Sequence, residues 1–306
     1  MLDLLSSATA LVALGFTFYL VSAQWSARRR QRQLARCRRA MIVCAHPDDE
    51  CMFFGPAVVG LLREPACVVY LLCLSTGDHE GLGRVRKEEL YRSCSVLGIK
   101  RENIILLRHS RLPDNPQRMW NDALLADIVL HHISSLDIDT VVSFDHQGVS
   151  YHRNHRSIFY GLVRMVSQEL LPTDCSVYFV PTVNRVRKYS SFMDVPITYL
   201  ANDIVFLASL DEWKRIQHAM AQHRSQLVWF RLLYMMFSRY VFINTLVQLR
   251  APPPPTTTTT TTPSSEGSDG AADATDAGDE SSTGEFLSPP ESPVPPEDTE
   301  GHEPVT

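Results

Sequence analysis

An imidazole and two adjacent carboxylates stand directly after a short apolar run in this chain. Residues 41–44 form the run, and His46, Asp48 and Asp49 follow it. A turn between a strand and a helix can aim His46 and Asp49, three positions apart, at one point. An imidazole and a carboxylate belong to the ligand sets that hold zinc, which leaves Asp48 as a general base. The alternative is that these residues merely cap a helix.

A second polar cluster follows another apolar run, residues 140–144, and contains Asp145, His152 and His155. His155 would complete a set of three protein ligands and leave one position for water. His152, when protonated, would then stabilise a tetrahedral oxyanion. The spacing equally allows the reverse, with His152 as the ligand. Asp145 either holds a histidine or binds substrate hydroxyls, unless it is an ordinary loop carboxylate. Together the clusters predict a one-metal hydrolase assembled from two strand ends.

Arg86 lies in the first turn of an expected helix, after the glycine-containing loop 76–83. A guanidinium there would bind an anionic or hydroxylated substrate, and a solvated helix face is the equal alternative. The loop lacks the third glycine of a dinucleotide fingerprint, so it does not indicate a nucleotide cofactor.

Both clusters depend on a fold that brings separate strand ends together. From about residue 40, short apolar runs alternate with stretches of helical periodicity. The expected strands are 41–44, 68–74, 104–107, 140–144 and 176–180, and the expected helices are 51–63, 84–97, 122–135, 155–169 and 210–222. This alternation predicts a Rossmann-like α/β fold, with a mostly parallel sheet and helices on both faces. Ligands of such sheets bind at the carboxyl ends of the strands, where both clusters fall.

The first 27 residues carry one charged side chain, Asp3, and a cluster of seven arginines begins at Arg28. The apolar stretch is long enough for a transmembrane helix, which needs about 20 residues. A cleaved signal peptide would carry its positive charges before the apolar run, whereas here they follow it, in the basic segment 28–39. Because positive flanks stay cytoplasmic, we expect residues 1–27 to be a single-pass anchor with the body in the cytosol.

Residues 40–249 are expected to form one folded domain, and residues 250–306 a disordered acidic tail rich in Pro, Thr and Ser. From residue 251 the tail holds 12 acidic and no basic residues, which leaves 29 basic against 22 acidic residues in the first 250. Seven of those basic residues are the arginine cluster, so the body is not expected to bind nucleic acid. The seven cysteines include no Cys-x-x-Cys pair, which fits a reducing compartment.

The apolar stretch 227–249 is interrupted by Arg231 and Arg239. An arginine near the centre of a helix costs roughly 2.5–3.5 kcal/mol on membrane insertion, so a second span is not expected. The stretch predicts either a helix that lies in the membrane interface or a helix that packs on the domain, and the sequence does not separate the two.

Two motifs carry a family resemblance. Residues 45–50, Ala-His-Pro-Asp-Asp-Glu, and residues 144–155, Phe-Asp-x-x-Gly-Val-Ser-x-His-x-Asn-His, resemble the LmbE-like zinc de-N-acetylases. Residues 187–189 and 223–231 make the chain most similar to the eukaryotic members, which act on N-acetylglucosaminyl-phosphatidylinositol. The resemblance extends over about residues 40–249. Tyr151 is a departure, because family members often have glycine there.

The resemblance implies a zinc ion, or another divalent metal, held by His46, Asp49 and His155. It also implies Asp48 as the base and His152 as the group that stabilises the oxyanion.

The implied activity is hydrolysis of the N-acetyl group of N-acetylglucosaminyl-phosphatidylinositol, with Arg86 in the substrate site. The implied place is the endoplasmic reticulum membrane, in the synthesis of glycosylphosphatidylinositol anchors. Two other functions stay open. One is a deacetylase for a soluble amino sugar, against which the two apolar stretches argue. The other is an inactive membrane-tethered scaffold, against which the intact histidines and aspartates argue.

Overall fold

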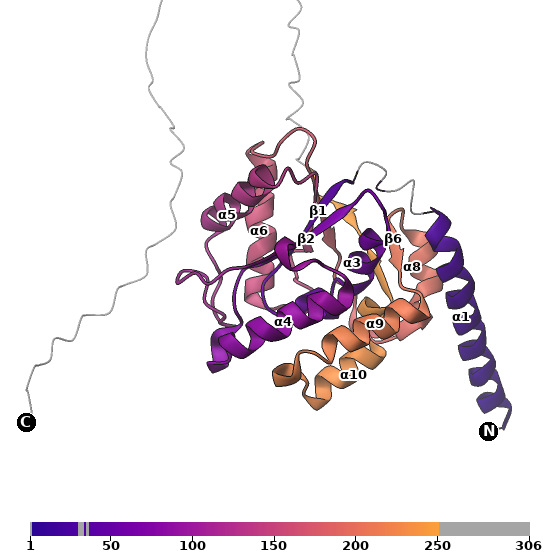
Figure 1. The fold of residues 1–306 in the computed structure, drawn as a ribbon. Helices are drawn as coiled ribbons and strands as arrows, with labels where there is room; N and C mark the ends of the chain where they lie inside the picture. The colour runs from indigo at the N-terminus through magenta and orange to yellow at the C-terminus, as the bar shows by residue number, and fades with distance from the viewer. Residues whose placement is uncertain (1, 30–33, 35–36, 251–306) are drawn as a thin grey trace, which may run out of the picture. The chain divides into compact units, whose positions relative to one another are not determined.

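A six-stranded sheet forms the centre of the protein (Figure 1). The computed structural model describes residues 2–29, 34 and 37–250. In spatial order the strands are β3 (Ile104–Leu106), β2 (Val68–Cys73), β1 (Arg39–Cys44), β4 (Thr140–Phe144), β5 (Ser176–Val180) and β8 (Val247–Gln248). The first five run parallel, and β8 pairs antiparallel with β5. The predicted mostly parallel α/β sheet is therefore confirmed.

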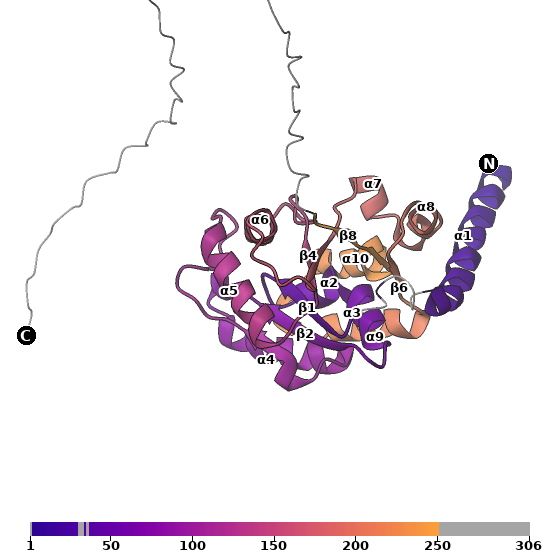
Figure 2. The same cartoon turned by 90° about the horizontal axis from the view of Figure 1, so that it is seen from above.

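Helices cover both faces of the sheet (Figures 1 and 2). On one face α5 (Asp122–Ser135) packs against α6 (Arg153–Ser167). On the other lie α3 (Gly55–Leu62) and α4 (Gly83–Leu97), and α9 (Leu210–Met220) packs on α4. Residues 40–44 and 140–144 are buried throughout, as expected for strands that are covered on both sides.

The order in which strands are added to the sheet reverses between the parallel strands β1 and β4. From β1 the chain continues to β2 on one side, whereas from β4 it continues to β5 on the opposite side. Such a switch point leaves a crevice outside the carboxyl ends of the two strands. Both polar clusters begin there, directly after Cys44 and Phe144.

Each of the five predicted strands begins and ends within two residues of its predicted range, but one predicted helix is divided. Residues 51–63 contain the second half of α2 (Asp49–Met52) and then α3. Pro56 lies in the first turn of α3, where a missing N–H is tolerated, and so favours a new helix start. The helix predicted over 155–169 begins earlier, because His152 accepts a hydrogen bond from the N–H of Asn154 and caps it.

The prediction of a single helix over 227–249 is wrong. Helix α10 covers Trp229–Phe237, and the chain then enters β7 (Ile243–Thr245) and β8. Strand β7 pairs antiparallel with β6 (Val205–Leu207) in a separate two-stranded sheet. Long-range contacts explain this path better than local periodicity, since β7 finds its partner 36 or more residues earlier in the chain.

Two buried polar side chains fix the segment after α10. Asn244 accepts a hydrogen bond from the N–H of Ala57 and donates one to the carbonyl oxygen of Phe53, each at 3.0 Å. The guanidinium of Arg239 is buried against Asp194, with Nε 2.7 Å from Oδ2. The polar residues that interrupt this apolar stretch therefore hold it to the domain.

Helix α1 (Leu2–Arg29) contains the stretch Ser6–Gln24, which among the described residues is the one candidate for a membrane span by length and hydropathy. Its carboxyl-terminal half contacts the body, where the hydroxyl of Tyr19 donates to the carbonyl oxygen of Ala208 at 2.8 Å. Between β5 and β6 lie α7 (Arg185–Lys188) and α8 (Val195–Ala201), and α8 packs against α1.

Two predictions fall on residues outside the described ranges. They are the disordered tail, apart from Arg250, and most of the central part of the basic segment 28–39. Both stay predictions, as does the membrane role of residues 1–27.

Candidate active site

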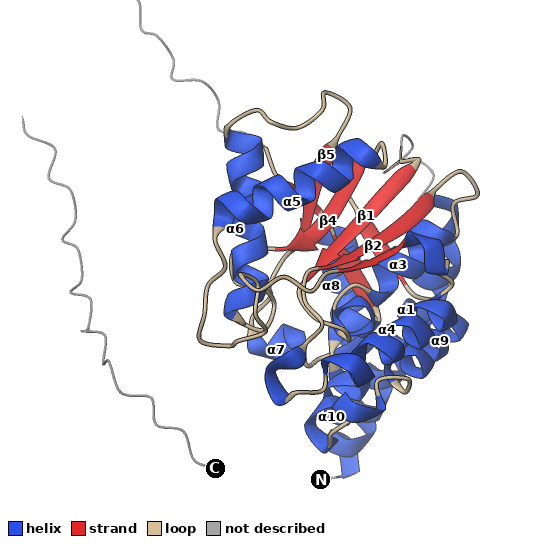
Figure 3. Cartoon of the chain, turned by 60° about the vertical axis from the view of Figure 1, so that its left-hand side comes forward, coloured by secondary structure: helices blue, strands red, loops and turns tan. Residues whose placement is uncertain are grey.

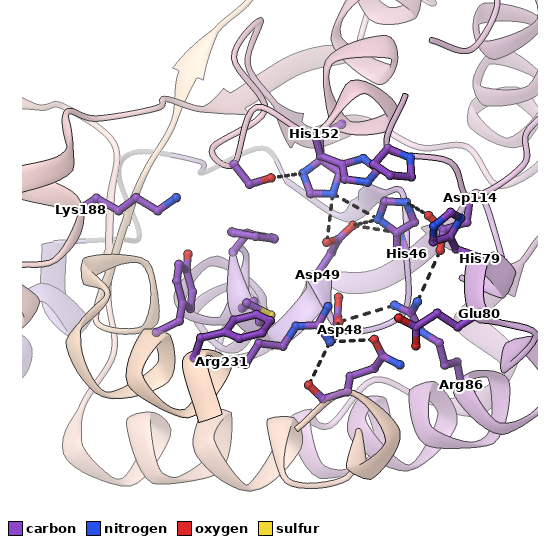
Figure 4. A pocket seen from close by; sticks show the side chains of 18 of the residues that line it. His46, Asp48, Asp49, His79, Glu80, Arg86, Asp114, His152, Lys188 and Arg231 are labelled. Carbon is purple, nitrogen blue, oxygen red and sulfur yellow. Dashed lines mark hydrogen bonds and ion pairs between the residues drawn. The ribbon is translucent and has the colours of Figure 1, made fainter. Parts of the chain in front are cut away.

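The turn from β1 into α2 presents His46, Asp48 and Asp49, the first residue of α2, at the carboxyl end of the sheet (Figure 4). All three side chains are buried. Oδ2 of Asp49 folds back onto the loop and accepts hydrogen bonds from the N–H groups of Ala45 and His46, each at 2.9 Å. Its other oxygen, Oδ1, lies 3.3 Å from Nε2 of His155. The loop thus anchors one oxygen of Asp49 and leaves the other to face the second cluster.

His155, in the first turn of α6, is oriented on two sides. Its ring stacks on Phe144, with centroids 4.1 Å apart and planes at 4°. Its Nδ1 lies 3.0 Å from the carbonyl oxygen of Gly148. Gly148 has a φ of +65°, and a Cβ there would lie 2.6 Å from Cβ of His155. This close approach therefore requires glycine, and it turns Nε2 of His155 toward Asp49.

The hydrogen-bond partners assign the proton of each imidazole. Nε2 of His46 lies 3.1 Å from acceptor oxygens of Asp114 and Asn154, so it carries the hydrogen and Nδ1 keeps a lone pair. Nδ1 of His155 faces a carbonyl oxygen, so its Nε2 keeps the lone pair. Nδ1 of His152 instead accepts from the N–H of Asn154 at 3.2 Å, so its Nε2 carries the hydrogen. His46 and His155 are thus arranged as ligands and His152 as a donor.

Three lone-pair atoms converge at the switch point: Nδ1 of His46, Nε2 of His155 and Oδ1 of Asp49. Nε2 of His155 lies 3.3 Å from each of the other two. A tetrahedral ion with bonds of about 2.1 Å separates its ligand atoms by roughly 3.4 Å, so the set fits a zinc-like ion with one further position. A nitrogen of His152 also lies within 4.8 Å of the other imidazoles. Distance alone therefore allows His152 as a ligand, and its proton argues against it.

The pKa values follow from the same contacts. Burial raises the pKa of Asp49, but His155 and His46 outweigh burial and hold it below its usual value. Burial lowers the pKa of His46, but the hydrogen bond to Asp114 and the charge of Asp49 outweigh it and raise that pKa. Burial, reinforced by His46 and His155, lowers the pKa of His152 to about 4. The protonated form expected for His152 is thus disfavoured near pH 7, and the neutral ring donates through Nε2.

Asp48 stands beside the ligand atoms in a strained conformation. Its φ of +108° is rare for a residue with a side chain and costs about 1–3 kcal/mol. Glu50 holds the turn, because its Oε2 accepts from the N–H of Asp48 at 2.9 Å while Oε1 pairs with His223 at 2.6 Å. Oδ2 of Asp48 lies 3.0 Å from Arg231 and 3.5 Å from Arg86. Burial nevertheless raises the pKa of Asp48, which suits a base.

The site opens into a pocket of about 520 Å³, which Arg86 lines on one side. The guanidinium of Arg86 donates to the carbonyl oxygens of Pro47 at 2.7 Å and Gly77 at 2.9 Å. Asp114 lies 3.5 Å from the same guanidinium and also contacts His46. Arg86 thus connects Asp48 with Asp114, which contacts His46, and it lines the pocket.

Asp145 has a different position from the one predicted. It is buried outside the residues that line the pocket. Its Oδ1 accepts hydrogen bonds from the N–H groups of Gln147 and Gly148, and both of its oxygens accept from Thr182. Asp145 therefore fixes the loop that carries Gly148 and does not line the pocket.

Three residues take part in the site in ways that the sequence reasoning did not assign. Asp114 lies between β3 and α5, in a segment without regular periodicity that gives no sequence signal. His223 pairs with Glu50, and Arg231 pairs with Asp48. Both belong to the motif 223–231, which is the one signal that would have placed them.

Known proteins are similar to this chain in sequence and in fold. The family model described as PIG-L: GlcNAc-PI de-N-acetylase matches residues 41–166. The N-acetylglucosaminyl-phosphatidylinositol de-N-acetylase of Bos taurus is 43% identical over 209 residues, which are 68% of this chain and 82% of that protein. A probable N-acetylglucosaminyl-phosphatidylinositol de-N-acetylase of Dictyostelium discoideum is 32% identical over 243 residues, with 70% and 94% covered.

Among solved structures, N,N'-diacetylchitobiose deacetylase from Pyrococcus horikoshii superposes with a TM-score of 0.52 at 16% identity. The match covers 74% of this chain and 90% of that one, and it shows a common fold. The fold thus places the chain among α/β proteins with a mostly parallel sheet. The chain belongs to the PIG-L family of GlcNAc-PI de-N-acetylases.

Replacing Asp114 by Asn should weaken metal binding, because His46 loses a charged partner that fixes its tautomer. We expect roughly a 10- to 100-fold loss of affinity, measured by metal retention against graded concentrations of a chelator. Asp122→Asn, on α5 outside the pocket, is the matched control and should behave like the wild type. Equal metal retention by the Asp114 and Asp122 variants would contradict the role given to Asp114.

Proposed function

We propose that this protein removes the acetyl group of N-acetylglucosaminyl-phosphatidylinositol by hydrolysis and releases acetate and glucosaminyl-phosphatidylinositol. The observation that carries this proposal is the convergence of the His46, Asp49 and His155 lone pairs beside Asp48. The identity of the substrate is inferred from the named relatives, since the bovine protein carries this activity in its name and is 43% identical. The reaction belongs to the synthesis of glycosylphosphatidylinositol anchors.

His46, Asp49 and His155 would hold a divalent metal, for which zinc is the best match to two imidazoles and a carboxylate. Bound there, zinc would acidify water toward a pKa of about 7 and polarise the amide carbonyl. Around the reacting atoms, Asp48 accepts the proton of the attacking water. The Nε2–H of His152 donates to the carbonyl oxygen as negative charge develops on it. Asp48 then returns its proton to the nitrogen that leaves as the amine.

The pocket and the membrane segments fit a lipid-linked sugar. Arg86 faces the pocket and contacts the substrate while it orients Asp48. Helix α1 anchors the chain through Ser6–Gln24, and the arginines that follow keep the body on the cytosolic side. The membrane is that of the endoplasmic reticulum. Helix α10 rests on the lipid surface, for which its exposed apolar side chains are the support.

Asp48→Asn should abolish most turnover while metal content stays at the wild-type level. The amide keeps the shape of the carboxylate but cannot accept the proton of water. We expect kcat to fall roughly 10²- to 10⁴-fold, measured as acetate release. Asp211→Asn, an exposed carboxylate of α9, is the control. A kcat close to that of the control would refute Asp48 as the base.

The substrate is tested by comparing acetate release from N-acetylglucosaminyl-phosphatidylinositol in mixed micelles with release from free N-acetylglucosamine. The full-length protein should favour the lipid-linked sugar by at least roughly 10-fold in kcat/KM, since remote groups add binding energy. Equal values would support a deacetylase for soluble amino sugars. A purified protein that contains no metal and hydrolyses neither substrate would support an inactive scaffold.

A further inference from the structure

The pocket has two distinct ends. At the inner end lie the three ligand atoms and Asp48. At the mouth lie Tyr189, which directly follows α7, and Phe230 of α10, both about half exposed. Tyr234, also of α10, packs edge-on against Tyr189. Figure 4 shows Lys188 on the side of the pocket opposite Arg86, with its side chain directed toward the site. A substrate that reaches the ligand atoms from the mouth therefore passes Lys188.

The two segments that contribute Tyr189 and Phe230 to this mouth, residues 185–189 and helix α10, carry exposed apolar side chains. We call them the apolar rim, which consists of Val186, Tyr189, Trp229, Phe230, Leu233 and Met236. Trp229 is 72% exposed and Val186 81%. Figures 1 and 3 place α10 and the amino-terminal end of α1, the candidate membrane span, at the same end of the molecule. Under the proposed function, in which α1 anchors the chain, the mouth of the pocket is the end that faces lipid.

The charges along the pocket are distributed unevenly. Arg86 and Arg231 are both ion-paired with Asp48. Lys188 pairs with no carboxylate within the described ranges. Its Nζ donates to the carbonyl oxygen of Val149 at 2.9 Å and lies over the rings of Tyr189 and Tyr234, 5.7 and 5.6 Å from their centroids. An ammonium has three N–H groups, so two remain to bind an anion.

The position of Lys188 is fixed by hydrogen bonds of the residue before it. The preceding residue, Arg187, donates through Nε to Oδ1 of buried Asp194 at 2.7 Å and through Nη2 to Thr198 at 2.8 Å. Asn184 caps the short helix α7 by accepting the N–H of Arg187. These bonds hold Lys188 between the apolar rim and the loop 145–152, which precedes α6 and His155. None of them involves the ammonium group of Lys188.

We propose that Lys188 binds the phosphodiester of the lipid-linked substrate and so selects a phosphorylated sugar over a neutral one. This proposal rests on the proposed function. In such a substrate the phosphate lies between the acyl chains and the acetylated sugar, as Lys188 lies between the apolar rim and the ligand atoms. The chemistry is a charge-assisted hydrogen bond to a phosphate oxygen in a partly buried place.

The test uses two water-soluble substrates that differ by the phosphate alone, N-acetylglucosaminyl-inositol phosphate and N-acetylglucosaminyl-inositol. The ratio of their kcat/KM values is compared in the full-length wild type, Lys188→Met, Lys188→Arg and Lys87→Met. Lys87 is an exposed residue of α4 outside this pocket and serves as the control. We expect the Met variant at Lys188 to lower the ratio roughly 10- to 100-fold, mainly through KM, and Arg to retain most of it.

An alternative role for Lys188 is structural, in which its hydrogen bond to Val149 stabilises the loop 145–152 that precedes His155. A structural effect of that kind would lower both kcat/KM values together, reduce bound metal and leave the ratio unchanged, and that result would overturn the proposal. A ratio that is already near one in the wild type would overturn it as well. Failure of the proposed function is a separate result, because the wild type would then deacetylate neither compound.

Discussion

The site depends on two imidazoles and one carboxylate that turn unprotonated atoms toward one point. Lone-pair atoms that face one another in a buried site repel. Each of these side chains must therefore be held in place by hydrogen bonds to its other nitrogen or oxygen atom. Asp114 and Asn154 hold His46, the carbonyl of Gly148 holds His155, and backbone N–H groups hold Asp49. A cation bound at this point would remove the repulsion among the three lone-pair atoms. The types of these atoms, rather than the shape of the pocket, therefore define the chemistry of the site.

The switch point of the sheet makes this convergence geometrically available. Strands β1 and β4 are neighbours, although almost 100 residues separate them, and their loops leave from the same edge. Phe144, the last residue of β4, then provides the surface on which His155 stacks. The strained turn at Asp48 is held by Glu50, whose ion pair with His223 is fully buried. Breaking such a pair from one side costs about 3–5 kcal/mol, so the network that holds the base also stabilises the fold.

The sequence predicts the parts of this structure that local patterns determine. The strands could be predicted because buried parallel strands form continuous apolar runs. The position of both polar clusters could be predicted because polar residues that follow such runs stand at the sheet edge. The choice of His155 over His152 as a ligand rests on the family resemblance, since the spacing allows both. Asp145 follows a strand in the same way, yet its oxygens bind Thr182 and its own loop. Sequence alone does not distinguish a carboxylate that faces a pocket from one that fixes a loop.

Other features depend on contacts between distant residues. Asp114 reaches His46 from an irregular segment, and β7 finds its partner β6 through long-range pairing that helical periodicity hides. The backbone at Tyr151 adopts a φ of +63°, the left-handed conformation that glycine adopts most easily. Glycine would adopt this conformation without strain, whereas this chain has a tyrosine there, and its side chain is largely exposed.

The most direct measurement is the metal content per chain of the purified wild type, His155→Ala and His152→Ala, with folding checked by circular dichroism. We expect about one equivalent of metal in the wild type and in the His152 variant, and none in the His155 variant. Metal that persists without His155, or is lost with His152, would contradict the ligand set on which the chemistry rests.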